Sequence, residues 1–195
     1  VDTVLALRKE YEKDIEIHLG LETEYFPKFW DQLIDFLSDY PFEYFLLGQH
    51  SLGNEIEKIL YSGHGTTEEK YLKQYVDQCL AGLDTGKYLY LAHPDLFRFD
   101  GDEAVFDREY RRLCREVKKR NIPLEINFLG LMEERWYPNE RFWKIAGEEG
   151  NTAVFGCDAH TPKAVWNPET EQKALLLAEK YGLEVQETVP MPKTF

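Results

Sequence analysis

The strongest constraint on the fold of this chain is a regular alternation between short apolar runs and longer segments with helical spacing of apolar residues. The short runs have the length of buried strands, and their alternation with helices favours parallel strands joined by right-handed crossovers. The sequence therefore predicts an α/β fold. Residues 51–65 are predicted as a loop, with Thr66 and Glu69 as a capping box after it. The predicted strands cover residues 15–22, 43–49, 87–92, 124–128, 152–156 and 183–188, and the predicted helices cover 2–14, 27–39, 67–83, 102–120, 140–149 and 162–181.

Residues suited to catalysis or metal binding stand at the ends of five predicted strands. The carboxyl ends of successive parallel strands meet at one mouth of a β/α barrel, where active sites are built. An open doubly wound sheet places its ligand at one switch point, to which few strands contribute. The recurrence therefore favours a barrel, although about six strands are predicted and a complete barrel has eight. The groups are Glu22, Gly48-Gln49-His50, His93-Pro94-Asp95, Glu125 with Asn127, and Gly156-Cys157-Asp158-Ala159-His160.

The residue types at these strand ends are those that bind divalent metal ions. Asp158 and His160 lie two positions apart in an extended segment, so their side chains share one side. Each position alone also has a structural explanation, as a solvated strand end (Glu22), a hydrogen-bonded histidine (His50 and His93) or a helix N-cap (Asp158). Together they favour a metal cluster, because carboxylates that converge without cations repel one another and raise each other's pKa.

The charge balance of the chain restricts its partners. The 195 residues include 36 acidic and 23 basic ones, which gives a formal net charge of -13. Such a surface repels phosphate backbones, so we expect no nucleic-acid partner, whereas a metal ion can still attract a small anionic substrate. Three cysteines without close pairs are not typical of a disulfide framework. Without a membrane-spanning stretch or a signal-peptide pattern, we expect a cytoplasmic protein with no membrane contact.

Six short motifs occur in an order that resembles the polymerase-and-histidinol-phosphatase (PHP) superfamily, and within it the histidinol-phosphate phosphatases. The resemblance covers nearly the whole chain and implies one domain over residues 1–195, a distorted seven-stranded TIM-like β/α barrel. Gln49 stands where the family more often has a small or apolar residue. The motifs are Gly20-Leu21-Glu22-Thr23-Glu24-Tyr25, Leu47-Gly48-Gln49-His50, His93-Pro94-Asp95-Leu96, Glu125-Ile126-Asn127, Tyr137-Pro138-Asn139 and Gly156-Cys157-Asp158-Ala159-His160.

The resemblance also implies a trinuclear site of divalent ions that hydrolyses phosphate esters. In that pattern Glu22 bridges two ions, and His50 and His93 hold the third. Asp158 ligates the first ion and His160 the second. Zn, Mn and Fe all accept histidine and carboxylate ligands, so the residue types leave the metal open.

The chain departs from the family pattern at its start. Members of the family open with a His-x-His strand, whereas no histidine precedes His18 here. We therefore expect the first strand–helix units to lie before Val1, in a segment of roughly 50–80 residues that carries the paired histidines.

The function that these features favour is a metal-dependent phosphomonoesterase, with L-histidinol phosphate of histidine biosynthesis as its substrate. Bound metals lower the pKa of water and neutralise phosphate oxygens, and Asp158 or His160 is suited to assist proton transfer as a catalytic residue. Two alternatives stay open. One is a nucleotide or oligonucleotide phosphodiesterase of the same superfamily, and the other is an inactive metal-binding or regulatory module.

Three basic residues are candidates for binding the substrate phosphate. Arg98 follows the third predicted strand and offers a planar fork to an anion, although an ion pair with Asp100 or Asp102 explains it equally well. Arg135 and Lys163 stand on other loops at the same mouth. Acidic residues near the mouth are candidates for the cationic end of the substrate, and His18 is predicted in the barrel interior. The acidic candidates are Glu24, Asp95, Glu133 and Glu134.

Overall fold

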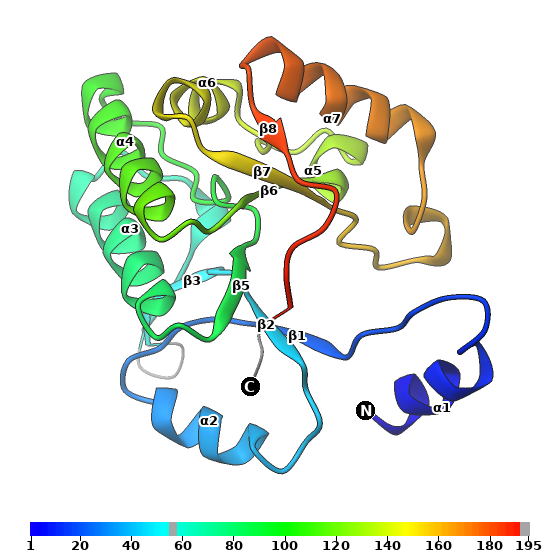
Figure 1. The fold of residues 1–195 in the computed structure, drawn as a ribbon. Coiled ribbons are helices and arrows are strands. Elements are labelled where there is room, and N and C mark those ends of the chain that lie inside the picture. The colour runs from blue at the N-terminus through cyan, green and yellow to red at the C-terminus, as the bar shows by residue number, and fades with distance from the viewer. Residues whose placement is uncertain (55–57, 192–195) are drawn as a thin grey trace.

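A computed structural model of the chain describes residues 1–54 and 58–191. Its centre is a sheet in which every neighbouring pair of strands is parallel, as Figure 1 shows. The order of strands across the sheet is β1-β2-β5-β6-β7-β8. The bounds are β1 Gly20–Thr23, β2 Tyr44–Leu47, β5 Tyr88–Leu91, β6 Leu124–Asn127, β7 Thr152–Gly156 and β8 Glu184–Val185.

Helices follow the strands along the chain. Four of the described helices start at residues whose short polar side chains accept hydrogen bonds from the first free N–H groups. Asp102 accepts from Ala104 and Val105, and Asn127 accepts from Gly130. Asn139 and Asn167 cap two later helices in the same way. The helices are α1 Asp2–Glu10, α2 Trp30–Leu37, α3 Glu69–Leu83, α4 Glu103–Lys119, α5 Phe128–Met132, α6 Glu140–Glu149 and α7 Pro168–Lys180, with 3₁₀ turns η1 Ser62–His64 and η2 Pro162–Ala164.

The core lies between the sheet and helices α3, α4 and α6, which pack in a row against it (Figure 1). Tyr75, Tyr110 and Trp143 are fully buried there and are among the largest side chains of the core. The four-residue strands of the sheet centre are too short to bury this surface alone, so the apolar faces of the helices complete the core. This packing holds the strand ends in fixed positions.

The α/β prediction is confirmed, and each predicted strand overlaps a strand of the observed sheet. Strand β1 begins five residues later than predicted and ends at Thr23, one residue beyond the predicted segment 15–22. The predicted loop 51–65 is wrong in part, because it holds an antiparallel hairpin, β3 Ser51–Asn54 and β4 Lys58–Tyr61, and then η1. Residues 55–57 of that prediction lie outside the described part of the chain. The predicted last helix begins at Pro168 rather than at residue 162, after η2.

The predicted capping box is also wrong. Helix α3 begins at Glu69, and its N-cap is Glu68, whose side chain makes no capping hydrogen bond. Thr66 instead accepts a hydrogen bond from the backbone N–H of Glu68 at 3.1 Å. The hydroxyl therefore supports the turn before the helix and not its first turn.

Six of the described strands form the parallel sheet, with β1 and β8 at its two edges, and β3 and β4 form a separate hairpin. This mostly parallel sheet with helices around it is consistent with a TIM-like fold. Among the described residues, no helix combines the length and the apolar character needed to cross a membrane.

Candidate metal centre

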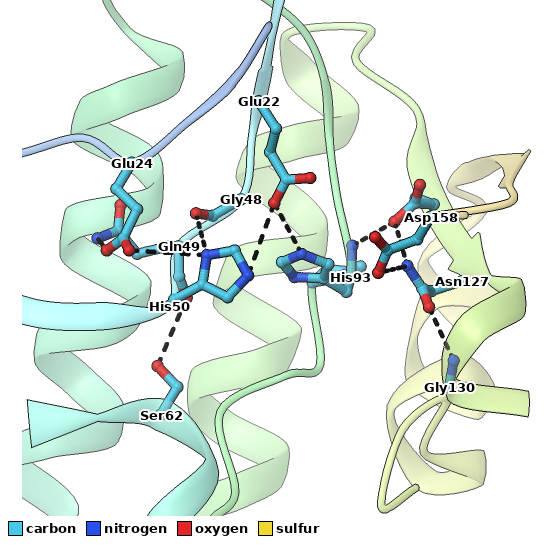
Figure 2. A network of polar contacts seen from close by, with 12 residues as sticks. Glu22, Glu24, Gly48, Gln49, His50, Ser62, His93, Asn127, Gly130 and Asp158 are labelled. Atoms are coloured by element: carbon cyan, nitrogen blue, oxygen red, sulfur yellow. Dashed lines mark hydrogen bonds and ion pairs between the residues drawn. The ribbon is translucent and has the colours of Figure 1, made fainter. Parts of the chain in front are cut away.

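The predicted site residues gather where strands β1, β2 and β5 end. Glu22 belongs to β1, while His50 and His93 follow β2 and β5 by a few residues. Figure 2 shows the three side chains pointing toward one another. Glu22 and His50 line a cavity of about 490 Å³ together with Asp158 and His160. His93 is buried and is not among the residues that line this cavity.

Glu22, His50 and His93 form a group with the geometry of a metal site. One ligand atom of each lies within 4.8 Å of the others. Glu22 Oε1 is 3.0 Å from His93 Nε2 and 3.6 Å from His50 Nε2. Atoms bound at about 2.1 Å to a tetrahedral zinc ion lie about 3.4 Å apart, a spacing that these two distances bracket. The three residues therefore fit a divalent ion.

Two glycines make room for carboxylates at the strand ends. A Cβ atom on Gly48 would stand 1.8 Å from Oε1 of Glu22, and one on Gly156 would stand 1.7 Å from Oε1 of Glu125. Glu22 and Glu125 can therefore lie across the ends of the neighbouring strands β2 and β7 only because those positions lack side chains.

The two histidines are held differently. The Nδ1 atom of His50 lies 3.0 Å from the carbonyl oxygen of Gly48, which can only accept a hydrogen bond. The proton of a neutral His50 is therefore on Nδ1, and Nε2 keeps a lone pair for a metal. His93 is held through its backbone, whose N–H donates to Glu125 at 2.8 Å. Its Nδ1 atom is buried without a hydrogen-bond partner in the described part of the chain.

The carboxylate of Glu22 and the two imidazole rings shift one another's pKa values. Burial raises the pKa of Glu22, but the hydrogen bond and charge of His93 outweigh it, so this pKa lies below its usual value. Burial lowers the pKa of His93, but Glu22 and Glu125 outweigh it and raise this pKa. Burial and the charge of His93 lower the pKa of His50. This shift favours the neutral form of His50, the form in which it can ligate a metal.

A second cluster lies beside the first, at the ends of β6 and β7. Asn127 donates hydrogen bonds to Glu125 and Asp158, each at 3.1 Å. Burial raises the pKa of Glu125, which is nearly inaccessible to solvent. The side chain of His160 is 72% exposed, and its Nδ1 lies 2.9 Å from the carbonyl oxygen of Asp158. Asp158 and His160 line the same cavity as His50.

The three predicted phosphate-binding residues separate in the structure. Arg135 lines the cavity and is held by the hydroxyl of Tyr137 at 2.7 Å and by Glu133 at 2.6 Å. Arg98 pairs with Asp100 at 3.2 Å and lines a neighbouring cavity of about 540 Å³. Lys163 lies exposed in η2 and is not among the residues that line either cavity.

Two further placements differ from the predictions. His18 is exposed, not interior, because β1 begins only at Gly20, and it pairs with Glu43 at 2.7 Å. Asp95 is buried and accepts a hydrogen bond from the backbone N–H of Asn139. Burial raises its pKa to about 7. Asp95 therefore ties the end of β5 to the start of α6, and it lines the neighbouring cavity that Arg98 also lines rather than the cavity of the ligand group.

Sequence reasoning missed the aromatic wall of the cavity. Tyr61, at the end of the hairpin strand β4, and Tyr137 line it together with Arg135. Tyr61 lay in a segment predicted as a loop, and no local pattern indicated that this segment folds back over the cavity.

Comparisons with family models and with curated proteins give no match. Among solved structures, the chain matches histidinol phosphate phosphatase from Lactococcus lactis subsp. lactis Il1403, complexed with zinc, L-histidinol and phosphate. The TM-score is 0.70 at 21% sequence identity, and the match covers 98% of this chain and 78% of that one. The chain shares the fold of that phosphatase. The predicted resemblance is therefore confirmed at the level of the fold.

Proposed function

We propose that this chain is a metal-dependent phosphomonoesterase that hydrolyses L-histidinol phosphate to L-histidinol and phosphate. The observation that carries the proposal is the convergence of Glu22, His50 and His93 at the ends of adjacent parallel strands. The chain shares its fold with a phosphatase whose structure contains zinc, L-histidinol and phosphate. Fold alone does not specify chemistry, so the proposal depends on the ligand group.

We assign Glu22, His50 and His93 as metal ligands and add Asp158 and His160 as further ligands of a trinuclear site. Zinc is the first metal to test, with Mn and Fe as alternatives. When bound, a divalent ion lowers the pKa of water and neutralises charge on phosphate oxygens. The protein contributes a rigid ligand frame, because the ends of the core strands carry the donors.

Arg135 is our first candidate for binding the phosphate. Arg135 lines the cavity, and Tyr137 and Glu133 hold its guanidinium in one orientation. The side chain therefore loses little conformational entropy when it binds an anion. Asp158 and His160 line the same cavity and are our candidates for moving a proton to the leaving alkoxide. Arg98 and Lys163 do not line the cavity of the ligand group, and we assign them only a secondary role in attracting the substrate.

The open edges of the described sheet support a larger architecture. Strand β1 pairs only with β2, and β8 only with β7, in the described part of the chain. We propose that further pairing at these edges completes one distorted seven-stranded barrel domain. We further propose a cytoplasmic enzyme of histidine biosynthesis, which agrees with cysteines that are free in the structure, Cys79, Cys114 and Cys157.

One observation favours a second function, an inactive metal-binding or regulatory module. The described residues offer one three-residue ligand group, and Asp158 and His160 are not part of it. Such a module would bind one metal ion without turnover.

Metal analysis and kinetics with the full protein test the proposal. We expect bound metal and hydrolysis of histidinol phosphate at a higher kcat/KM than of an aryl phosphate or a nucleoside monophosphate. Preference for a nucleotide or a phosphodiester would favour the phosphodiesterase alternative. Bound metal without hydrolysis of any ester would favour the inactive module.

A further inference from the structure

Gln49 is a fully buried polar residue directly before His50, with 0% of its surface exposed. Its Oε1 accepts a hydrogen bond from the backbone N–H of Tyr25 at 3.0 Å. Its Nε2 donates to the carbonyl oxygen of Ser51 at 2.7 Å and to Glu24 at 3.3 Å. A buried amide is costly unless it is bonded in this way. Gln49 thus ties the segment after β1 to the segment after β2.

Glu24 is the centre of this arrangement. Its Oε2 accepts the hydrogen bond from Gln49 and another from the backbone N–H of Ser51 at 2.9 Å. Its Oε1 lies 3.6 Å from His50 Nδ1, and Figure 2 shows the carboxylate facing that ring. Three N–H groups therefore face one carboxylate. An amide side chain, with a single acceptor oxygen, cannot serve all three.

This arrangement determines which ring nitrogen of His50 carries the proton. Both polar neighbours of Nδ1, the carbonyl oxygen of Gly48 and the carboxylate of Glu24, are acceptors. They hold the proton on Nδ1 and leave the lone pair of Nε2 directed toward Glu22. Carboxylates that face the second nitrogen of a metal-binding histidine commonly fix its orientation and raise its basicity.

We propose that Glu24, anchored by Gln49, is a positioning residue that fixes the tautomer and orientation of His50 in the metal centre. The proposal rests on the metal-dependent function proposed above. It gives Glu24 a role other than recognising the cationic end of a substrate. It also gives a physical reason for a polar residue at position 49, because an apolar residue there would leave Glu24 and Ser51 without this partner.

The test compares Glu24→Gln and Gln49→Met with a control, Glu133→Gln. The control removes the same charge from a carboxylate that pairs with Arg135, which lines the cavity. Zinc affinity is measured by competition with a chelating dye, and circular dichroism checks that each variant is folded. The ¹⁵N chemical shifts of the His50 ring are measured in the metal-free proteins, with assignment by a His50→Gln variant.

We expect Glu24→Gln to weaken zinc binding about 10- to 100-fold, the usual effect of removing such a partner. We expect its His50 shifts to move toward a mixture of tautomers, Gln49→Met to show the same changes to a smaller degree, and Glu133→Gln to resemble the wild type in both readouts. Unchanged zinc affinity and unchanged His50 shifts in Glu24→Gln would overturn the proposal. A change confined to KM for cationic substrates would overturn it too, and would make Glu24 a substrate-binding residue.

The two readouts also separate this proposal from the proposed function. If the wild type binds no metal, the metal-dependent function fails. The ¹⁵N shifts of the metal-free protein would then still decide whether Glu24 sets the tautomer of His50.

Discussion

Replacing Gly48 with alanine should abolish tight metal binding while leaving the fold almost intact. The new Cβ would stand 1.8 Å from Oε1 of Glu22, whereas ordinary contact begins at 3.4 Å. The carboxylate oxygen therefore has to move by about 1.6 Å, a displacement close to the length of a zinc–oxygen bond, about 2.0–2.2 Å. Glu22 then leaves the position in which it faces both histidines.

The expected losses of zinc affinity and of stability in Gly48→Ala can be estimated from the displacement of Glu22. Disturbing a partner of a ligand costs about 10- to 100-fold in metal affinity, so displacing a ligand itself should cost more than about 100-fold. The metal-free protein should lose less than about 1 kcal/mol of unfolding free energy, because the side chain of Glu22 is 34% exposed and can swing into solvent. That loss corresponds to a decrease in Tm of at most about 2–4 °C for a chain of this size.

Dye competition for zinc and thermal melting of the metal-free protein measure the two effects separately. Gly86→Ala is the matched control, because Gly86 has φ +69° and a Cβ there meets no atom within 4 Å. Its backbone strain should cost about 1–2 kcal/mol of stability with zinc affinity unchanged. Wild-type zinc affinity in Gly48→Ala would refute the reasoning, because it would mean that Glu22 is not a ligand in the position described.

Three further predictions concern the site and the fold. Zinc at 100 times its Kd should stabilise the wild type by about 2.7 kcal/mol; His93→Ala should lose this gain in melting experiments, and His18→Ala should keep it. Arg135→Ala should raise KM for histidinol phosphate or lower kcat while metal content by elemental analysis stays normal, since arginine is not a ligand. The hydrogen bond from Arg115 lowers the pKa of Glu149 in the folded protein. The stability that this ion pair adds is therefore fully present above the unfolded pKa of glutamate, near 4.3. It is lost as the pH falls through the lower pKa of the folded state. Glu149→Gln should therefore cost about 1 kcal/mol at pH 7 in urea unfolding, and this difference should shrink as the pH falls below the unfolded pKa.

Most of the secondary structure was predictable because its signal is local. Strand and helix periodicity depends on neighbours in the chain, and every strand of the parallel sheet overlaps a predicted segment. The ends of elements were less predictable. Helix α7 begins at Pro168 because Asn167 caps it, whereas the sequence also offered Pro162 as a start. The hairpin β3–β4 has four-residue strands, too short to show a clear alternation.

The candidate site was predictable in outline for a topological reason. Parallel strands bring their carboxyl ends to one edge, so residues at those ends lie close together even when they are far apart in the chain. Glu22, His50 and His93 fulfil this expectation as one ligand group. The roles of Asp158 and His160 stay predictions, since these residues line the same cavity outside that group.

The sequence by itself determined the alternation of strands and helices and the residue types at the strand ends, since both are properties of short segments. Only the tertiary structure decided which side chains meet. It separates Arg135, which lines the cavity, from Arg98, which pairs with Asp100, and it places Gln49 behind His50. These outcomes depend on distances between segments that are remote in the chain. A side chain exchanges one partner for another when it moves by a few ångströms. The sequence pattern locates a residue only to a strand end or a loop, which is too coarse to decide between such partners.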